Sequence, residues 1–168
     1  VQPTSIEVNL NNSLFGTEYS GPASGITDDN PVIGVTDNVT VTYAGSGNHY
    51  INDSQIRFYP NNKLTFDAPS GYEISEIVFT SAGTWAATIS ANTGTYVSNT
   101  KTWTGSAASV LFTGSGSSRC DMSKANITLV SLGNAVATTT TIDATGISNT
   151  NLYTGTEAGS LSATVTVT

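Results

Sequence analysis

The amino-acid sequence predicts an all-β protein, an antiparallel β-sandwich of jelly-roll-like architecture, from three observations. Apolar and polar residues alternate with period two in most segments, which is the pattern of strands with one buried face. The 168 residues include 28 Thr, 21 Ser, 15 Asn and 16 Gly, nearly half of the chain, and this composition disfavours helices. Gly, Pro and Asn recur between the alternating segments, as they do in the turns of sandwiches and barrels.

The first third of the chain contains two alternating segments separated by a long loop. Residues 6–10 and 39–43 alternate between apolar and polar side chains, and Asn11 to Ser13 form a turn. Residues 16–31 are rich in Gly, Pro and Asp, so we expect a loop there and no regular element. No helix is expected anywhere in the chain.

The middle of the chain continues the strand pattern. Residues 56–59 and 64–66 alternate on either side of an Asn61-Asn62 turn, and residues 74–79 follow with a one-residue slip near Ser75. Such a slip indicates a β-bulge. Alternation also places four phenylalanines in the core: Phe58, Phe66, Phe79 and Phe112. Trp103 is expected to pack there as well.

The remaining strands are short until the last one. Alternating or apolar segments lie at residues 86–89, 94–97, 101–104, 110–112 and 125–132. Residues 1–132 thus supply roughly nine or ten strands, enough for one sandwich. Residues 133–168 contain only two strand-like segments, which cannot bury a core alone. We therefore expect a linker and the truncated start of a second domain; the alternative is that this segment pairs with the main sheet. Unpaired strands in it favour a strand-exchanged dimer.

Charge and residue counts exclude several classes of partner. The net charge is −7, and the five basic residues form no cluster along the sequence: Arg57, Lys63, Lys101, Arg119 and Lys124. Nucleic acid and anionic membrane surfaces are therefore disfavoured, and a neutral ligand or a cation is favoured. One Cys and one His exclude a multi-cysteine zinc site and a His-rich metal site. No apolar run is long enough for membrane insertion.

Three segments resemble a β-sandwich module that recurs in secreted and surface proteins of Bacteroidetes and Firmicutes. These are residues 54–66, residues 71–80 and residues 102–110. The resemblance implies a carbohydrate-binding-like sandwich, a secreted or cell-surface location, and other domains on the same polypeptide. The chain departs from the module at residues 127–130, where the usual tyrosine is missing. The segment from Thr138 to Gly146 resembles the opening of a bacterial immunoglobulin-like repeat.

The candidate ligand-binding residues are aromatic or polar side chains in segments that we expect to be loops or strand ends. Aromatic rings stack on the C–H faces of sugars, and neighbouring polar groups fix the hydroxyls. Each candidate also has a structural interpretation without a ligand. His49 is an exposed loop histidine in that case, Arg57 forms an ion pair with Asp53 or Asp67, and each tyrosine packs within its loop. The candidates are Trp85, Tyr96, Tyr50, His49, Tyr19 and Arg57.

The sequence therefore predicts a non-catalytic carbohydrate-binding module that binds a neutral polysaccharide through loop aromatics. The alternative is a structural or adhesive spacer with no small-molecule ligand. The sequence contains neither a nucleophile elbow nor a diagnostic pair of acids, so we do not expect an enzyme. No cofactor is required. A structural calcium ion at Asp28 and Asp29 is a further expectation, although Asx turns explain the same residues.

Overall fold

The computed structural model describes residues 2–21 and 25–133. Thirteen strands and one short helix make up this part of the chain. In chain order they are β1 Thr4–Asn9, α1 Asn12–Phe15, β2 Tyr19–Gly21, β3 Val32–Thr36, β4 Val39–Gly45, β5 His49–Ile51, β6 Ile56–Phe58, β7 Asn62–Asp67, β8 Tyr72–Trp85, β9 Thr88–Ala91, β10 Thr95–Val97, β11 Thr102–Ala107, β12 Ser109–Ser115 and β13 Cys120–Ser131.

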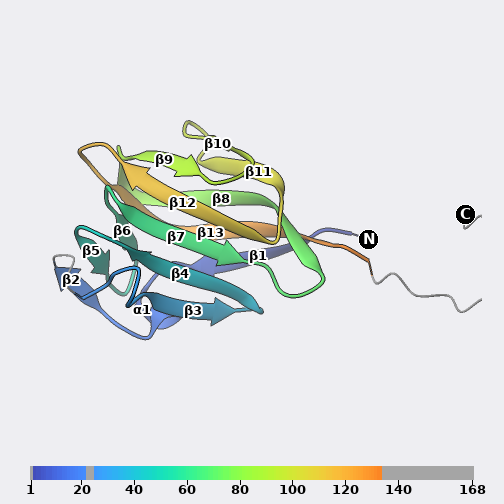
Figure 1. Ribbon diagram of the computed structural model, residues 1–168, viewed down its shortest axis with the longest axis horizontal. Coiled ribbons are helices and arrows are strands. Elements are labelled where there is room, and N and C mark those ends of the chain that lie inside the picture. Colours follow the sequence, from blue (N-terminus) through green and yellow to red (C-terminus); the bar gives the residue numbers. More distant parts are fainter. Residues whose placement is uncertain (1, 22–24, 134–168) are drawn as a thin grey trace, which may run out of the picture. The chain divides into compact units, whose positions relative to one another are not determined.

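The strands form two antiparallel sheets that pack face to face (Figure 1). The larger sheet has the order β10-β11-β8-β13-β6-β5-β2, with β1 also paired to β13. The smaller sheet has the order β3-β4-β7-β12-β9. Strands β2, β5 and β6 gather at one end of the sandwich, on the left in Figure 1. The predicted all-β sandwich is confirmed.

Strand β13 organises the larger sheet because it pairs along both edges. One edge pairs with β8, and the other pairs first with β6 and then with β1. The register against β8 shifts between Thr128 and Leu129, which leaves Ser75 as an extra residue on β8. The predicted bulge near Ser75 is confirmed. A second irregularity, around residues 82–84 of β8, lies opposite the beginning of β13.

The core lies between the two sheets and consists of the inward-facing residues of nearly every strand. The four predicted phenylalanines are buried, and Phe66, Phe79 and Phe112 form a cluster whose ring centroids are 5.1–6.1 Å apart. Trp103 is fully buried, and its indole Nε1 donates to the backbone carbonyl of Thr93 at 2.6 Å. The prediction of these residues as core is confirmed.

Three elements of the first third of the chain differ from expectation. The turn at Asn11 begins a one-turn helix, α1, because the Asn11 side chain accepts a hydrogen bond from the Leu14 backbone and caps it. The expected loop of residues 16–31 contains strand β2 and a buried apolar anchor, Ile26. Strand β3 was not expected; its side chains at Ile33 and Val35 face solvent, and its buried residue is Gly34, which has no side chain to pack.

The last strand is longer than its sequence pattern indicates. It begins at Cys120, five residues before the expected start. A glycine- and serine-rich segment precedes this strand. Residues 134–168, including the predicted immunoglobulin-like start and its strand exchange, lie outside the described residues. Within the described ranges, no helix is long and apolar enough to cross a membrane.

Candidate functional site

The outer face of the larger sheet carries a row of polar and aromatic side chains where β2, β5, β6 and β13 lie side by side. The strand register places Ser20 opposite Tyr50, Tyr50 opposite Arg57, and Arg57 opposite Asp121. Because side chains two residues apart share a face of a strand, Tyr59 and Arg119 belong to the same surface. We call Tyr50, Arg57, Tyr59, Arg119 and Asp121 the arginine–tyrosine face.

Asp121 is the electrostatic centre of the arginine–tyrosine face. Arg119 Nε donates to its Oδ1 at 2.8 Å, and Arg57 Nε lies 3.8 Å from the same oxygen. The hydrogen bond to Asp121 is the main reason that the pKa of Arg119 is raised. The irregular part of β8 closes over the other oxygen, since the Thr84 backbone N–H donates to Oδ2 at 3.0 Å. A Cβ at Gly83 would come within 2.9 Å of that oxygen, so a larger residue there would require the Asp121 carboxylate to shift.

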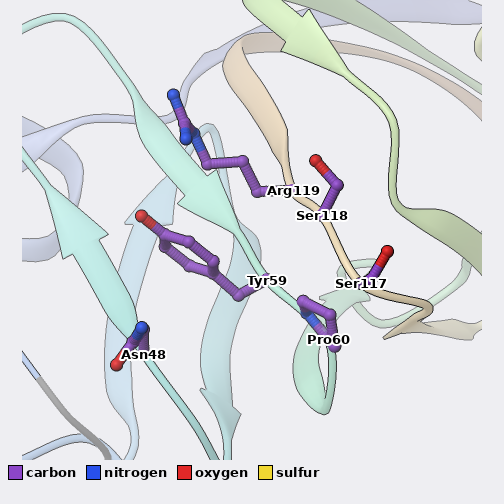
Figure 2. Close-up of a pocket in the computed structure, with 6 residues that line it drawn as sticks. All are labelled: Asn48, Tyr59, Pro60, Ser117, Ser118 and Arg119. Carbon is purple, nitrogen blue, oxygen red and sulfur yellow. The ribbon is translucent and has the colours of Figure 1, made fainter.

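Two cavities lie next to one another on this face and share Asn48 and Tyr59. The larger, of about 390 Å³, is lined by Asn48, Tyr59, Pro60, Ser117, Ser118 and Arg119. The smaller, of about 230 Å³, is lined by Ser20, Gly21, Asn48, His49, Tyr50, Arg57 and Tyr59. Figure 2 shows the Tyr59 ring and the Arg119 side chain extending in the same direction from neighbouring segments.

Arg57 contacts Tyr50 of the neighbouring strand. Its guanidinium carbon lies 4.1 Å from the centre of the Tyr50 ring, within the distance of a cation–π contact. This contact restrains the guanidinium group. The alternative role considered for Arg57, an ion pair with Asp53 or Asp67, is wrong. The strand register brings Asp121 beside it instead.

The loops that line the larger cavity are held by a buried amide, Asn62. Its Oδ1 accepts from the Tyr43 hydroxyl and from the Tyr59 backbone N–H, both at 2.8 Å. Its Nδ2 donates to the carbonyls of Ser46 at 3.2 Å and of Asn48 at 3.0 Å. Asn62 is fully buried, so one side chain fixes the backbone of the two residues that the cavities share.

Gly45 allows this close approach of the loops. Its φ angle is 100°, in the left-handed region, and a Cβ there would lie 2.2 Å from the Asn61 carbonyl oxygen. Only glycine accommodates both the backbone conformation and the contact. The turn between β4 and β5 therefore packs directly against the turn between β6 and β7, which places Asn48 beside Tyr59.

His49 lies below this face and points into the protein. The sequence suggested a loop residue, but His49 begins strand β5 and is 1% exposed. Its Nε2 lies 2.9 Å from the Ala44 carbonyl, so Nε2 carries the proton and donates to that oxygen. The ring also packs edge-on against Tyr43 at 4.9 Å between centroids. His49 thus supports the site from inside, and its placement does not favour direct contact with a ligand.

The buried position of His49 makes the fold sensitive to mild acid. Burial lowers the pKa of His49 from its ordinary value of 6.5, against the opposing effect of backbone hydrogen bonds to Ala44 and Gly47. The unfolded chain therefore takes up a proton first as the pH falls below about 6.5. We expect the free energy of unfolding to be constant from pH 8 to 7 and to decrease below pH 6.5, by at most about 1.4 kcal/mol per pH unit.

Chemical denaturation at several pH values measures this slope. His49 is the only histidine in the sequence, and carboxylates titrate mainly below this range. The His49→Gln variant is therefore the control, and its stability should not change between pH 7 and 5.5. A wild-type stability that is constant or rises on acidification would contradict the assignment.

The rings of Trp85 and Tyr96 pack against the core, although Trp85 itself lies opposite Cys120 in the strand register. Both rings are half-buried and pack against Phe79, at 6.1 Å and 6.4 Å between centroids, and Lys101 Nζ lies 5.5 Å from the Trp85 ring. Burial raises the pKa of the Tyr96 hydroxyl to about 12. These contacts place the two rings at the margin of the core, and neither lines either of the two cavities on this face.

The other predicted site residues have structural contacts. Tyr19 begins strand β2, and its ring lies 6.5 Å from His49 in an edge-on arrangement. Asp28 accepts from Lys63 Nζ at 2.6 Å, with both side chains in solvent. Among the described residues, no three His, Cys, Asp or Glu side chains are arranged to hold a metal ion. The structure therefore offers no support for calcium at Asp28 and Asp29.

The two cavities are lined mainly by groups that form hydrogen bonds. The residues that line the two cavities include amides, hydroxyls, phenols and guanidinium groups but no carboxylate. Glycoside hydrolysis uses two carboxyl groups across the substrate. Asp121 is the carboxylate next to these cavities, and both of its oxygens already accept hydrogen bonds.

Several residues of this site were not identified from the sequence, among them Asn48, Tyr59 and Arg119. The five basic residues appeared unclustered, yet Arg57 and Arg119 converge on one carboxylate. A signal existed in the spacing of Arg57 with Tyr59 and of Arg119 with Asp121, each pair on one face of a strand. Comparisons with protein-family models, curated proteins and solved structures found no match.

Proposed function

We propose that this chain is a non-catalytic carbohydrate-binding module of a secreted or surface-located multidomain protein, and that it binds a polysaccharide at the arginine–tyrosine face. The observation that carries the proposal is the pair of adjacent cavities that share Asn48 and Tyr59. An aromatic ring at the junction of two polar cavities offers an apolar surface to a sugar ring, with hydrogen-bonding groups on either side.

The side chains around Tyr59 match the needs of a sugar. Asn48, Ser117 and Ser118 supply amide and hydroxyl groups, and Arg57 and Arg119 supply N–H donors. The face is built on strands, which fix the spacing of Tyr50, Arg57 and Asp121 through backbone pairing. A rigid sheet face loses little entropy on binding. The resemblance of residues 54–66, 71–80 and 102–110 to a carbohydrate-binding-like module also supports this function.

The competing function is that of a structural or adhesive spacer. Trp85 and Tyr96, two of the aromatics predicted to bind, pack against the core and favour this alternative. Binding at the arginine–tyrosine face therefore separates the two functions.

Retention on insoluble polysaccharides tests the proposal. We expect the wild-type chain to be retained by at least one polymer with an affinity between about 1 µM and 1 mM. The Tyr59→Ala variant should bind about tenfold more weakly, because the loss of one stacked ring removes about 1 kcal/mol or more.

Tyr72→Ala is the matched control. Tyr72 is an exposed tyrosine that pairs with Ser131, at the opposite end of β13 from Cys120 and Asp121. Its removal should leave retention unchanged. No retention of the wild-type chain by any polymer, or equal retention of wild type and Tyr59→Ala, would favour the spacer.

A further inference from the structure

The charged residues of the chain are distributed unevenly. Lys63 pairs with Asp28 at 2.6 Å, and Lys124 pairs with Glu7 at 2.9 Å, whereas Lys101 lies 5.5 Å from the Trp85 ring and makes no ion pair with the described residues. Arg57 and Arg119 instead share the single carboxylate of Asp121. Two positive charges against one leave a local excess of positive charge, although the net charge of the chain is −7.

Asp121 does not satisfy the hydrogen-bonding capacity of the two arginines. Its side chain is 7% exposed, and it engages Nε of Arg119 and the Thr84 backbone. Arg57 Nε is buried and makes no hydrogen bond to the described residues. Within the described part of the chain, the terminal Nη groups of both arginines also have no hydrogen-bond acceptor. The two side chains are about one third exposed, at 32% and 33%.

The geometry of Arg57 suits a planar anion at the surface. The guanidinium carbon lies 4.1 Å from the centre of the Tyr50 ring, so a cation–π contact restrains the group before any ligand arrives. A carboxylate accepts two parallel hydrogen bonds from such a group, and this bidentate pairing is among the stronger charge-assisted interactions. Tyr59 lines the cavity beside Arg57 as well as the one beside Arg119. A sugar ring on Tyr59 would bring a ring carboxylate within reach of a guanidinium.

We propose that the polysaccharide recognised at the arginine–tyrosine face carries a carboxylate, as in a polymer of uronic acids, and that Arg57 binds this carboxylate. The inference rests on the proposed function and names the substrate class of the same site. It differs from the expectation of a neutral ligand, which followed from the net charge of the whole chain. The local excess of one charge fits isolated carboxylates better than a densely sulfated polymer, which the remaining negative surface would repel.

A pair of polymers that differ only in charge tests the inference. Polygalacturonate and its methyl ester share the same sugar backbone, but the ester has no free carboxylate. We expect affinity electrophoresis to show wild-type binding to polygalacturonate at least about tenfold tighter than to the ester. Alginate and hyaluronate, compared with the neutral polymers dextran and galactomannan, extend the test to other uronates, and dextran sulfate tests sulfate.

Variants assign the preference to Arg57. Arg57→Lys keeps the charge but removes the planar fork, so it should lose most of the preference for uronates. Lys124→Gln removes a basic residue paired with Glu7 on the same sheet and should keep the full preference. Thermal unfolding of each variant verifies that the fold is retained, and Arg57→Gln gives a second, uncharged replacement.

The outcomes separate this inference from the proposed function. Equal binding to uronate and ester, or Tyr59-dependent binding to neutral polymers alone, would overturn the carboxylate while leaving carbohydrate binding intact. Tighter binding to dextran sulfate than to every uronate would also overturn it, as would a uronate preference that Arg57→Lys and Arg57→Gln leave unchanged. Binding to none of these polymers would overturn both proposals.

Discussion

Replacing Asn62 with alanine is expected to lower the free energy of unfolding by about 3–5 kcal/mol. The side chain is fully buried and joins four groups: the Tyr43 hydroxyl, the Tyr59 N–H, and the Ser46 and Asn48 carbonyls. Alanine would leave all four without this partner, and a buried polar group that loses its hydrogen bond is costly. Urea denaturation measures the change.

The neighbouring residue provides a control of the same type. Asn61 is exposed and has a φ angle of 66°, so Asn61→Gly keeps the backbone conformation and removes no buried hydrogen bond. We expect its stability to lie within about 0.5 kcal/mol of wild type. A similar loss for both variants would show that the turn, and not the Asn62 amide, is the important feature. Asn62→Ala should also weaken polysaccharide retention, because Asn62 positions Asn48 and Tyr59.

Replacing Trp103 with alanine is expected to cost about 3–5 kcal/mol. The indole is fully buried, and its Nε1 donates to the Thr93 carbonyl at 2.6 Å. Glycines pack directly against the ring, since a Cβ at Gly94 or Gly105 would lie 2.6 Å from indole atoms. The surrounding backbone is therefore shaped to this side chain and is not expected to collapse into the cavity. Thermal or chemical unfolding measures the loss.

Trp85→Ala is the matched comparison for Trp103→Ala. Trp85 is the other tryptophan of the chain, half-buried at the margin of the core, with no hydrogen bond from its Nε1 to the described residues. We expect its removal to cost less than half as much. A larger loss for Trp85→Ala than for Trp103→Ala would contradict the assignment of Trp103 as the central packing residue of β11.

The alternation of side chains was sufficient to predict the sandwich, because burial of one strand face dominates the sequence of most strands. Phe58, Phe66 and Phe112 occupy inward positions that period two identifies directly. Strand β3 escaped the prediction because Gly34 is its buried residue, covered by Leu14 of α1, while Ile33 and Val35 face solvent. In this strand the apolar side chains occupy the exposed face, and the buried position is a glycine.

The candidate site was predictable only in part, because it depends on strand register between distant segments. Tyr50 and Arg57 were identified as candidates from their local sequence, and they do meet. Arg119 and Asp121 join them because β13 pairs with β6. Arg119 is 62 residues from Arg57 along the chain. The packing of the Trp85 indole against Phe79 was not predictable, because it depends on how the irregular end of β8 turns.

The most direct test of the account is to map the binding surface by NMR. A ¹H–¹⁵N spectrum of the labelled chain would be recorded during titration with an oligosaccharide cut from the polymer that retains it. We predict that the amide signals of Asn48, Tyr50, Arg57, Tyr59 and Ser117 to Arg119 shift together, while those of Tyr96 and Tyr72 do not move. Saturable shifts centred on Trp85 and Tyr96, with the arginine–tyrosine face unaffected, would contradict it.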